Sequence, residues 1–247
     1  MPTVLASGGP GGGPAYVFVR ESAQFLNAGL RTFNLVSQGG FTAVGMVMFT
    51  GAMTGSTSDW ENVFDFGNGG VGLQANNIVL SRHAGTQNLN FEIRSGTNVC
   101  KIADTVAFVQ NQWTKFVVLY DHSTREVRCR VNNAATFSTT ICANGIVTDR
   151  TVTHTNIGSD VLGSAARLQG RVAGLFAVDQ VLSHSEIAGL FARMSAGDDT
   201  IQPCATCPAG TTSSPDSMGP NSCVLPCAHG FMRGGPTENF PRIFPGQ

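Results

Sequence analysis

Four cysteines near the C-terminus are the residues whose type and spacing most directly suggest chemistry. They form a Cys-x2-Cys pair and a Cys-x3-Cys pair, with fifteen residues between the pairs and His229 close by. This spacing is near that of a zinc site. The segment between the pairs is rich in proline and serine and has no β-hairpin signal, which favours disulfides instead. The four residues are Cys204, Cys207, Cys223 and Cys227, and the sequence does not select one of their three possible connectivities.

Three further cysteines lie in the body of the chain, so at most one pair can form among them. Cys129 alternates with Val127 and Val131, a pattern typical of one buried strand face, and is expected to be a buried thiol. Cys100 and Cys142 are therefore the candidates for a disulfide. A bridge from the body to the C-terminal cysteines, or to another chain, stays open as an alternative.

A pair of carboxylates on one strand face would suit glycoside hydrolysis. Glu61 and Asp65 are four residues apart, so on a regular strand their side chains share a face. No third carboxylate supports them. The chain also has no Gly-x-Ser-x-Gly elbow, His-Glu-x-x-His motif or phosphate-binding loop. The sequence therefore predicts that the protein is not an enzyme.

The composition argues against two classes of partner. Charged residues make up 13% of the chain and the formal net charge is −1, whereas nucleic acids and anionic membrane surfaces select basic stripes. No apolar run approaches the ~20 residues that span a bilayer, so membrane insertion is not expected. Seven cysteines suggest an oxidising compartment, although residues 1–14 do not resemble a signal peptide. We therefore expect a mature or excised part of a secreted or cell-surface protein, a virion surface included.

Short β-rich runs separated by Gly, Asn, Asp and Ser recur through the body of the chain. Leu89, Phe91 and Ile93 alternate with polar residues, as expected of a half-buried strand. Many short strands with turn signals between them indicate an all-β fold, an antiparallel jelly-roll sandwich.

One short helix is predicted near residues 184–195. Ser183 and Glu186 have the spacing of a capping box at its start. The apolar residues that then repeat with helical spacing are Ile187, Leu190, Phe191 and Met194.

Composition divides the chain into four regions. They are a flexible Gly/Pro-rich arm (1–14), the jelly-roll domain (15–196), a disulfide-rich segment (197–233) and an extended or disordered tail (234–247).

Several motifs, in order along residues 15–196, resemble the laminin G-like jelly rolls of concanavalin A type. Residues 60–67, WENVFDFG, resemble the family's Trp-x-x-Ile-Phe-Asp-Phe-Gly segment. Residues 113–121, WTKFVVLYD, resemble its Trp-x-x-Val-x-Val-x-Tyr-Asp strand, and residues 156–158, NIG, its closing strand. The resemblance implies a sandwich that recognises glycans or proteins. Laminarinase-type members carry catalytic carboxylates as Glu-x-Asp-x-x-Glu, which this chain lacks.

The C-terminal segment resembles a different family. Residues 204–211, CATCPAGT, resemble the Cys-x-x-Cys-Pro-x-Gly-Thr phrase of ephrin-receptor and TNF-receptor Cys-rich repeats. Residues 223–227 would start the next repeat, which departs from the pattern after Gly230. The resemblance implies a short disulfide-rich array that is cut off or capped.

The laminin G-like resemblance also implies a Ca2+ site at the rim of the sandwich, and no other cofactor is expected. Ca2+ takes six to eight oxygen ligands. Asp59 and Asp160 lie near strand ends and are the expected ligands. The alternative is that these aspartates only form turns.

The leading hypothesis is an extracellular, non-catalytic module that binds a glycan or a protein through loops at one rim or through one sheet face. Trp60, Arg82 and His83 border the long polar loops and are the candidate ligand-binding residues. For Trp60, core packing is favoured over a contact with a ligand. A second hypothesis is a self-assembling structural subunit of a cell-surface filament, wall or virion, tied together by the odd cysteine. A glycoside hydrolase is the least favoured.

Overall fold

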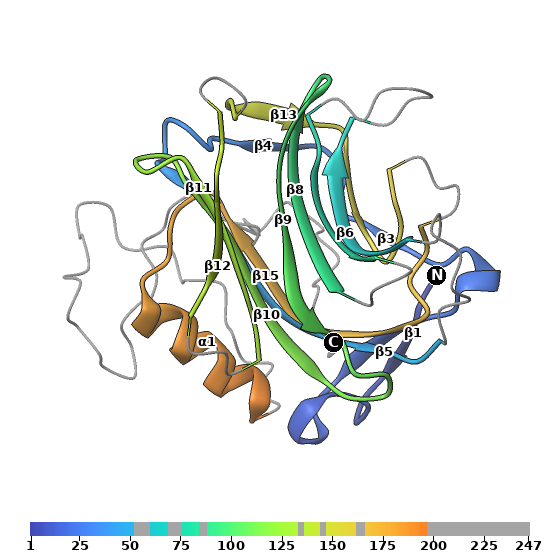
Figure 1. Cartoon of the computed structure of the whole chain (residues 1–247). Helices are drawn as coiled ribbons and strands as arrows, with labels where there is room; N and C mark the ends of the chain where they lie inside the picture. Colours follow the sequence, from blue (N-terminus) through green and yellow to red (C-terminus); the bar gives the residue numbers. More distant parts are fainter. Residues whose placement is uncertain are drawn as a thin grey trace, which may run out of the picture.

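A computed structural model describes residues 1–51, 60–68, 76–83, 88–132, 136–143, 147–161 and 166–196. Two antiparallel sheets face each other, and the described chain has one α-helix, which confirms the predicted all-β sandwich (Figure 1). The Cys-rich segment and the C-terminal tail lie outside the described residues, as do their four cysteines.

Neighbouring strands in each sheet run antiparallel to each other. The seven-stranded sheet contains, in spatial order, β1 (Thr3–Leu5), β2 (Ala15–Phe18), β15 (Gly170–Val178), β5 (Gly40–Phe49), β10 (Thr114–Asp121), β11 (Glu126–Val131) and β12 (Ser138–Ile141). The six-stranded sheet contains β3 (Leu26–Asn27), β14 (His154–Ile157), β6 (Trp60–Gly67), β7 (Ile78–His83), β8 (Asn88–Ser95) and β9 (Asn98–Ala107). A ribbon of β4 (Arg31–Phe33) and β13 (Arg150–Val152) closes one end (Figure 1).

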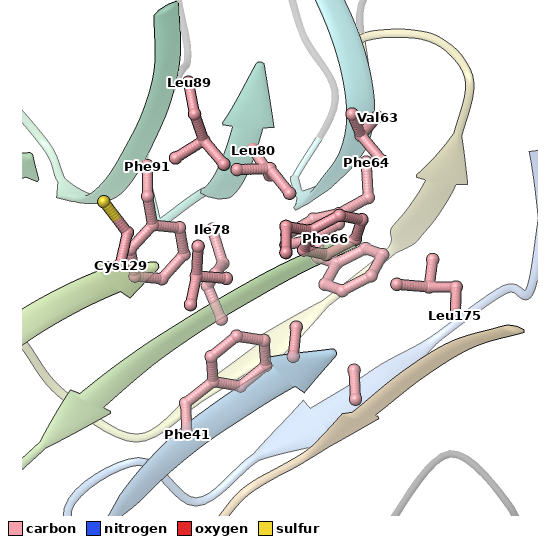
Figure 2. Packing of buried hydrophobic residues seen from close by; sticks show 14 of the residues in the cluster. Phe41, Val63, Phe64, Phe66, Ile78, Leu80, Leu89, Phe91, Cys129 and Leu175 are labelled. Carbon is pink, nitrogen blue, oxygen red and sulfur yellow. The ribbon is translucent and has the colours of Figure 1, made fainter. Parts of the chain in front are cut away.

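Aromatic side chains fill the space between the two sheets. Phe64 and Phe66 stack with ring centroids 4.5 Å apart, and Phe33 stacks on Phe66 at 5.7 Å. Phe41 of one sheet meets Phe91 of the other at 6.3 Å (Figure 2). Burying one such side chain stabilises the fold by about 1.5–3 kcal/mol, so this cluster is the main force that holds the sheets together.

Helix α1 (His184–Ser195) covers the outer side of the seven-stranded sheet (Figure 1). The predicted capping box is present, because the Ser183 side chain accepts from the Glu186 N–H while the Glu186 carboxylate accepts from the Ser183 N–H. The four predicted apolar residues of the helix are buried in a second cluster with Val44, Val117 and Phe176. No helix in the described ranges has the length and apolar character needed to cross a bilayer.

The N-terminal arm differs from the flexible segment that its composition predicts. Residues 3–5 pair with β2 as the edge strand of the seven-stranded sheet, and Pro10–Gly12 form a 3-10 turn, η1. Arg20–Ser22 form a second such turn, η2, after β2. The glycines give the arm its turns, and the backbone hydrogen bonds to β2 hold it against the sheet.

A disulfide between Cys100 and Cys142 closes one side of the sandwich. Cys100 lies on β9, an edge strand of the six-stranded sheet, and Cys142 directly follows β12, an edge strand of the other. Their Cα atoms are 5.3 Å apart, within the usual range for a disulfide. Cys129 lies in the core on β11 and is not part of this disulfide. Because it is buried, it offers no accessible thiol for a tie between subunits.

We predict that loss of this disulfide destabilises the sandwich without changing its fold. The two cysteines are separated by 42 positions, and the chain-entropy model assigns a closed loop of that size roughly 4 kcal/mol. Urea unfolding should show that the Cys100→Ala/Cys142→Ala variant and the reduced wild type share a lower free energy of unfolding than the oxidised protein. Equal midpoints for oxidised and reduced protein would contradict this assignment.

Candidate functional site

A β-bulge in β6 decides which side chains of the six-stranded sheet point outward. Asn62 lies opposite Ser81 and Phe64 lies opposite Leu80, so Val63 is an extra residue without a partner on β7. Strand β7 alternates regularly, and Leu80 is buried in the core. Beyond the bulge the alternation of β6 is therefore shifted by one residue. The expectation that Glu61 and Asp65 share a face is wrong, because the bulge lies between them: Glu61 faces inward and Asp65 outward.

Glu61 forms a buried ionic network beneath the sheet. Its carboxylate is fully buried and pairs with Arg82 of β7 and Arg20 of η2. Arg82 also donates to the Gly51 carbonyl oxygen at 3.2 Å, and its guanidinium lies 4.1 Å from the ring centroid of Phe49. Burial lowers the pKa of Arg82, and the charge of Glu61 opposes that effect. Arg82 is 1% exposed, so the structure places this candidate ligand residue inside the sandwich instead of on its surface.

The other side of the same sheet carries polar and aromatic side chains on five neighbouring strands. We call this side of the sheet the outer polar face; its members other than Trp60, His83, Arg94 and Lys101 are buried. It consists of Trp60, Asn62 and Asp65 on β6, Asn77, Ser81 and His83 on or beside β7, Asn90, Glu92 and Arg94 on β8, Lys101 on β9 and Asn156 on β14.

Two of the predicted ligand residues meet at one end of this face. Trp60 and His83 are cross-strand partners, and their rings are half-buried in a T-shaped arrangement with centroids 4.4 Å apart. The next row along the strands contains Asn62, Ser81 and Asn90. The aromatic pair therefore borders a row of amide and hydroxyl groups.

An ion pair lies further along β8. The Arg94 Nε donates to Glu92 Oε2 at 2.7 Å, and its Nη2 lies 2.5 Å from the same oxygen. Asn90 Nδ2 donates to the other carboxylate oxygen, Oε1, at 2.8 Å. Lys101 is the cross-strand partner of Glu92 and is exposed. Each positive charge in this part of the face is thus adjacent to the carboxylate of Glu92.

Asp65 is the most perturbed carboxyl group of the face. Burial raises its pKa to about 7, and the nearby charge of Asp160 acts in the same direction. Two hydrogen bonds oppose this rise, one from the Val161 N–H at 3.0 Å and one from Asn77 Nδ2, also at 3.0 Å. Near neutral pH, the charged and the uncharged forms of this carboxyl group are therefore both populated.

Three buried oxygens at the Asp65 end have no hydrogen-bond partner: Asn77 Oδ1, Asn156 Oδ1 and Ser159 Oγ. Asn77 and Asn156 adjoin Asp65 directly, one through a hydrogen bond and one as its cross-strand partner. Buried polar atoms are normally paired, and amide oxygens accept hydrogen bonds. A bound water, or another group that brings O–H or N–H donors, would satisfy these oxygens.

The structure does not decide the calcium prediction. Asp59 lies outside the described residues, whereas Asp160 lies close enough to Asp65 to raise its pKa. Among the described residues there is no group of three or more His, Cys, Asp or Glu side chains that could hold a metal ion. A calcium site at this rim stays a prediction from the family resemblance.

The outer polar face contains residues that sequence reasoning missed. Asn90, Glu92 and Arg94 alternate with the core residues Leu89, Phe91 and Ile93, so the period of two predicts that they share a face, although Asn90 and Glu92 are themselves buried. Nothing in that pattern separates a binding face from a hydrated one. Asn77 and Asn156 approach Asp65 only through pairing between strands that are distant in the sequence.

Comparison with known proteins identifies the fold. A family model described as the concanavalin A-like lectin/glucanases superfamily matches residues 52–188. It agrees with the laminin G-like resemblance and ends before the Cys-rich segment, whose receptor-like character stays a prediction. No curated protein matches the chain.

Solved structures from two organisms share the fold at low sequence identity. The IT-sialidase CBM40 of Ruminococcus gnavus is 15% identical, with a TM-score of 0.51 over 68% of this chain and 98% of that chain. The heptameric SAP-like pentraxin of Limulus polyphemus is 12% identical, with a TM-score of 0.50 over 70% and 79%. The same CBM40 bound to α2,3-sialyllactose gives 15% identity and a TM-score of 0.49 over 68% and 98%. The first two likenesses concern the fold alone.

We predict that Glu61→Ala destabilises the protein by about 3–5 kcal/mol, because it leaves Arg82 buried without its counter-charge. The double variant Glu61→Leu/Arg82→Met should recover part of that loss, since no buried charge then remains on β7. Denaturant unfolding of both variants measures this. If Glu61→Ala lowers the free energy of unfolding by less than about 1 kcal/mol, the ion pairs of Glu61 add little to stability.

The pKa of Asp65 predicts a pH dependence of stability. A folded-state pKa of about 7, above the ordinary 3.8, means that the free energy of unfolding falls as the pH rises from about 4 to 7. The difference is on the order of 4 kcal/mol. Asp65→Asn should therefore gain stability relative to wild type across that range, as measured by urea unfolding at pH 4 to 8.

Asp149 offers a control of opposite sign. Although burial raises its pKa, hydrogen bonds from Val36 and Ser37 outweigh that effect and hold it below the ordinary value. Asp149→Asn should lose stability relative to wild type as the pH rises through the acid range. A constant difference between Asp65→Asn and wild type across pH would contradict the assignment for Asp65.

Proposed function

The chain belongs to the concanavalin A-like lectin/glucanases superfamily, and we propose that it is a non-catalytic module that binds a glycan on the outer polar face. The observation that carries this proposal is a half-buried aromatic pair beside a row of amide and hydroxyl groups on one side of the sheet, with unpaired acceptors buried further along it. A sugar presents an apolar ring face and several hydroxyl donors, so it complements both features.

The Trp60–His83 pair supports a stacking contact at one end of the face. An aromatic ring with a partly exposed surface can cover the C–H groups of a sugar ring and remove them from water. The indole N–H remains a donor for a hydroxyl oxygen. Because the rings are packed against each other at 4.4 Å, they are held in position before a ligand arrives.

The amide groups support recognition of hydroxyls along the rest of the face. Each asparagine offers two N–H donors and one carbonyl acceptor, and a sugar hydroxyl can act in both roles. Asn77 Oδ1 and Asn156 Oδ1 are buried acceptors without a donor. A ligand hydroxyl that reached them would remove a cost of about 1–3 kcal/mol for each unsatisfied group.

The arrangement of carboxylates supports binding without hydrolysis. Glu61 is locked between two arginines beneath the sheet. Asp65 and Glu92 both point outward, but Val79 lies between them, so their backbones are about 10 Å apart at the spacing of two strands. Glu92 is held by Arg94 and Asn90, so its carboxylate is already engaged within the protein.

An extracellular or cell-surface location accompanies this proposal. The Cys100–Cys142 disulfide supports it, since disulfides persist mainly in oxidising compartments.

We predict that Trp60→Ala weakens binding of a glycan at least about tenfold, or about 1.4 kcal/mol, because the stacking surface is lost. Oligosaccharides selected on a glycan array and titrated by calorimetry provide the measurement. Phe137→Ala is the matched control, because Phe137 is a half-buried aromatic that packs beside α1 on the other sheet. Equal effects of the two substitutions, or cleavage of the bound oligosaccharide, would contradict the proposal.

A further inference from the structure

We infer that the outer polar face selects uncharged, hydroxyl-rich saccharides over sialylated or other acidic ones. This inference rests on the proposed function and names the class of ligand for the same face. It departs from the CBM40 relative, which has been solved with α2,3-sialyllactose bound.

The first observation is that the arginine of the outer polar face is already occupied. Proteins bind carboxylates best through the two parallel N–H groups of an arginine fork. In Arg94, Nε and Nη2 form that fork, and both meet the Oε2 atom of Glu92, at 2.7 and 2.5 Å. An acidic sugar that used this edge of the guanidinium would have to displace Glu92, which is 6% exposed and would then be a buried charge without its arginine partner.

The second observation concerns Arg82, the other arginine on the central strands of the six-stranded sheet. Arg82 of β7 points to the inner side, where it pairs with Glu61 and donates to the Gly51 carbonyl oxygen. It is 1% exposed and therefore cannot meet a ligand on the outer face. Neither arginine thus presents an open Nε–Nη2 edge to the outer face in the described part of these strands.

The remaining charges of the face nearly balance. Lys101 is a single ammonium directly across from Glu92, and Asp65 adds a partial negative charge at neutral pH. His83 and His154 are the other groups on this sheet that can carry positive charge. The sequences of residues 52–59, 69–75 and 84–87, which join these strands, contain no lysine or arginine. The charged side chains of this face therefore give an acidic sugar little net electrostatic attraction, because Glu92 and Asp65 repel it.

The pairing of Glu92 makes the inference testable by a single conservative change. Glu92→Gln keeps an acceptor and nearly the same shape beside Asn90 but removes the charge that holds the Arg94 fork. Glu126→Gln is a closely matched control, because Arg128 Nε and Nη2 meet Glu126 Oε2 at 2.8 and 2.6 Å on β11 of the opposite sheet. Glu126 has no part in the outer polar face.

The experiment measures binding of lactose and α2,3-sialyllactose, together with an array of other matched uncharged and sialylated oligosaccharides, in 50 and 500 mM NaCl. The wild type should bind uncharged members at least as tightly as their sialylated counterparts, with less than about a twofold change with salt. Glu92→Gln should gain at least about fivefold in affinity for sialylated members, and that gain should shrink at high salt. Glu126→Gln should behave as wild type.

Two results would overturn the inference, and they differ in what they mean for the proposed function. Sialylated members that bind the wild type at least tenfold more tightly, in a salt-dependent way, would refute selectivity while leaving glycan binding in place. If no member of either class binds and Trp60→Ala changes nothing, the proposed function fails and this inference falls with it.

Discussion

One extra residue in β6 determines how the six-stranded sheet distributes its side chains. Val63 has no partner on β7, so both Glu61 before it and Phe64 after it face inward. Phe64 and Phe66 can then stack in the core, while Asn62 and Asp65 lie on the other side of the sheet, where both are buried. With regular alternation, Glu61 and Phe64 would point to opposite faces. Either an aromatic ring would be exposed, or the carboxylate of Glu61 would lie away from Arg82 and Arg20.

The bulge also gives two carboxylates on one strand different chemistry. Glu61 is buried between two guanidinium groups, which supply its counter-charge. Asp65 is buried and hydrogen-bonded to an amide and a main-chain N–H; the more distant charge of Arg94 does not offset its burial, and its pKa rises to about 7. Glu61 and Arg82 are therefore paired on the inner side of this sheet. The outer polar face carries amides, a hydroxyl, an aromatic pair, the paired Glu92 and Arg94, and the side chains of Asp65 and Lys101, and from this arrangement we infer recognition of uncharged sugars.

Much of the fold follows from local patterns in the sequence. The alternation of Leu89, Phe91 and Ile93 predicts a strand, and the Ser183 capping box predicts the helix with its observed bounds. The site is less predictable. Arg82 and His83 are consecutive on a strand, so the period of two already implies that they cannot both face a ligand. The bulge leaves no signature, because Val63 is an ordinary strand residue and only its pairing with β7 reveals it. The contacts of Asp65 with Asn77 and Val161 join segments that are 12 and 96 positions away, beyond the reach of local patterns.

The most direct test of glycan recognition is to follow the NMR signals of the folded protein while an oligosaccharide that binds it is titrated. We predict that the Trp60 indole N–H and the side-chain amides of Asn62, Asn77 and Asn90 shift together and saturate at one affinity. Shifts confined to residues around α1 and β11, with the signals of the outer polar face unchanged, would contradict the account.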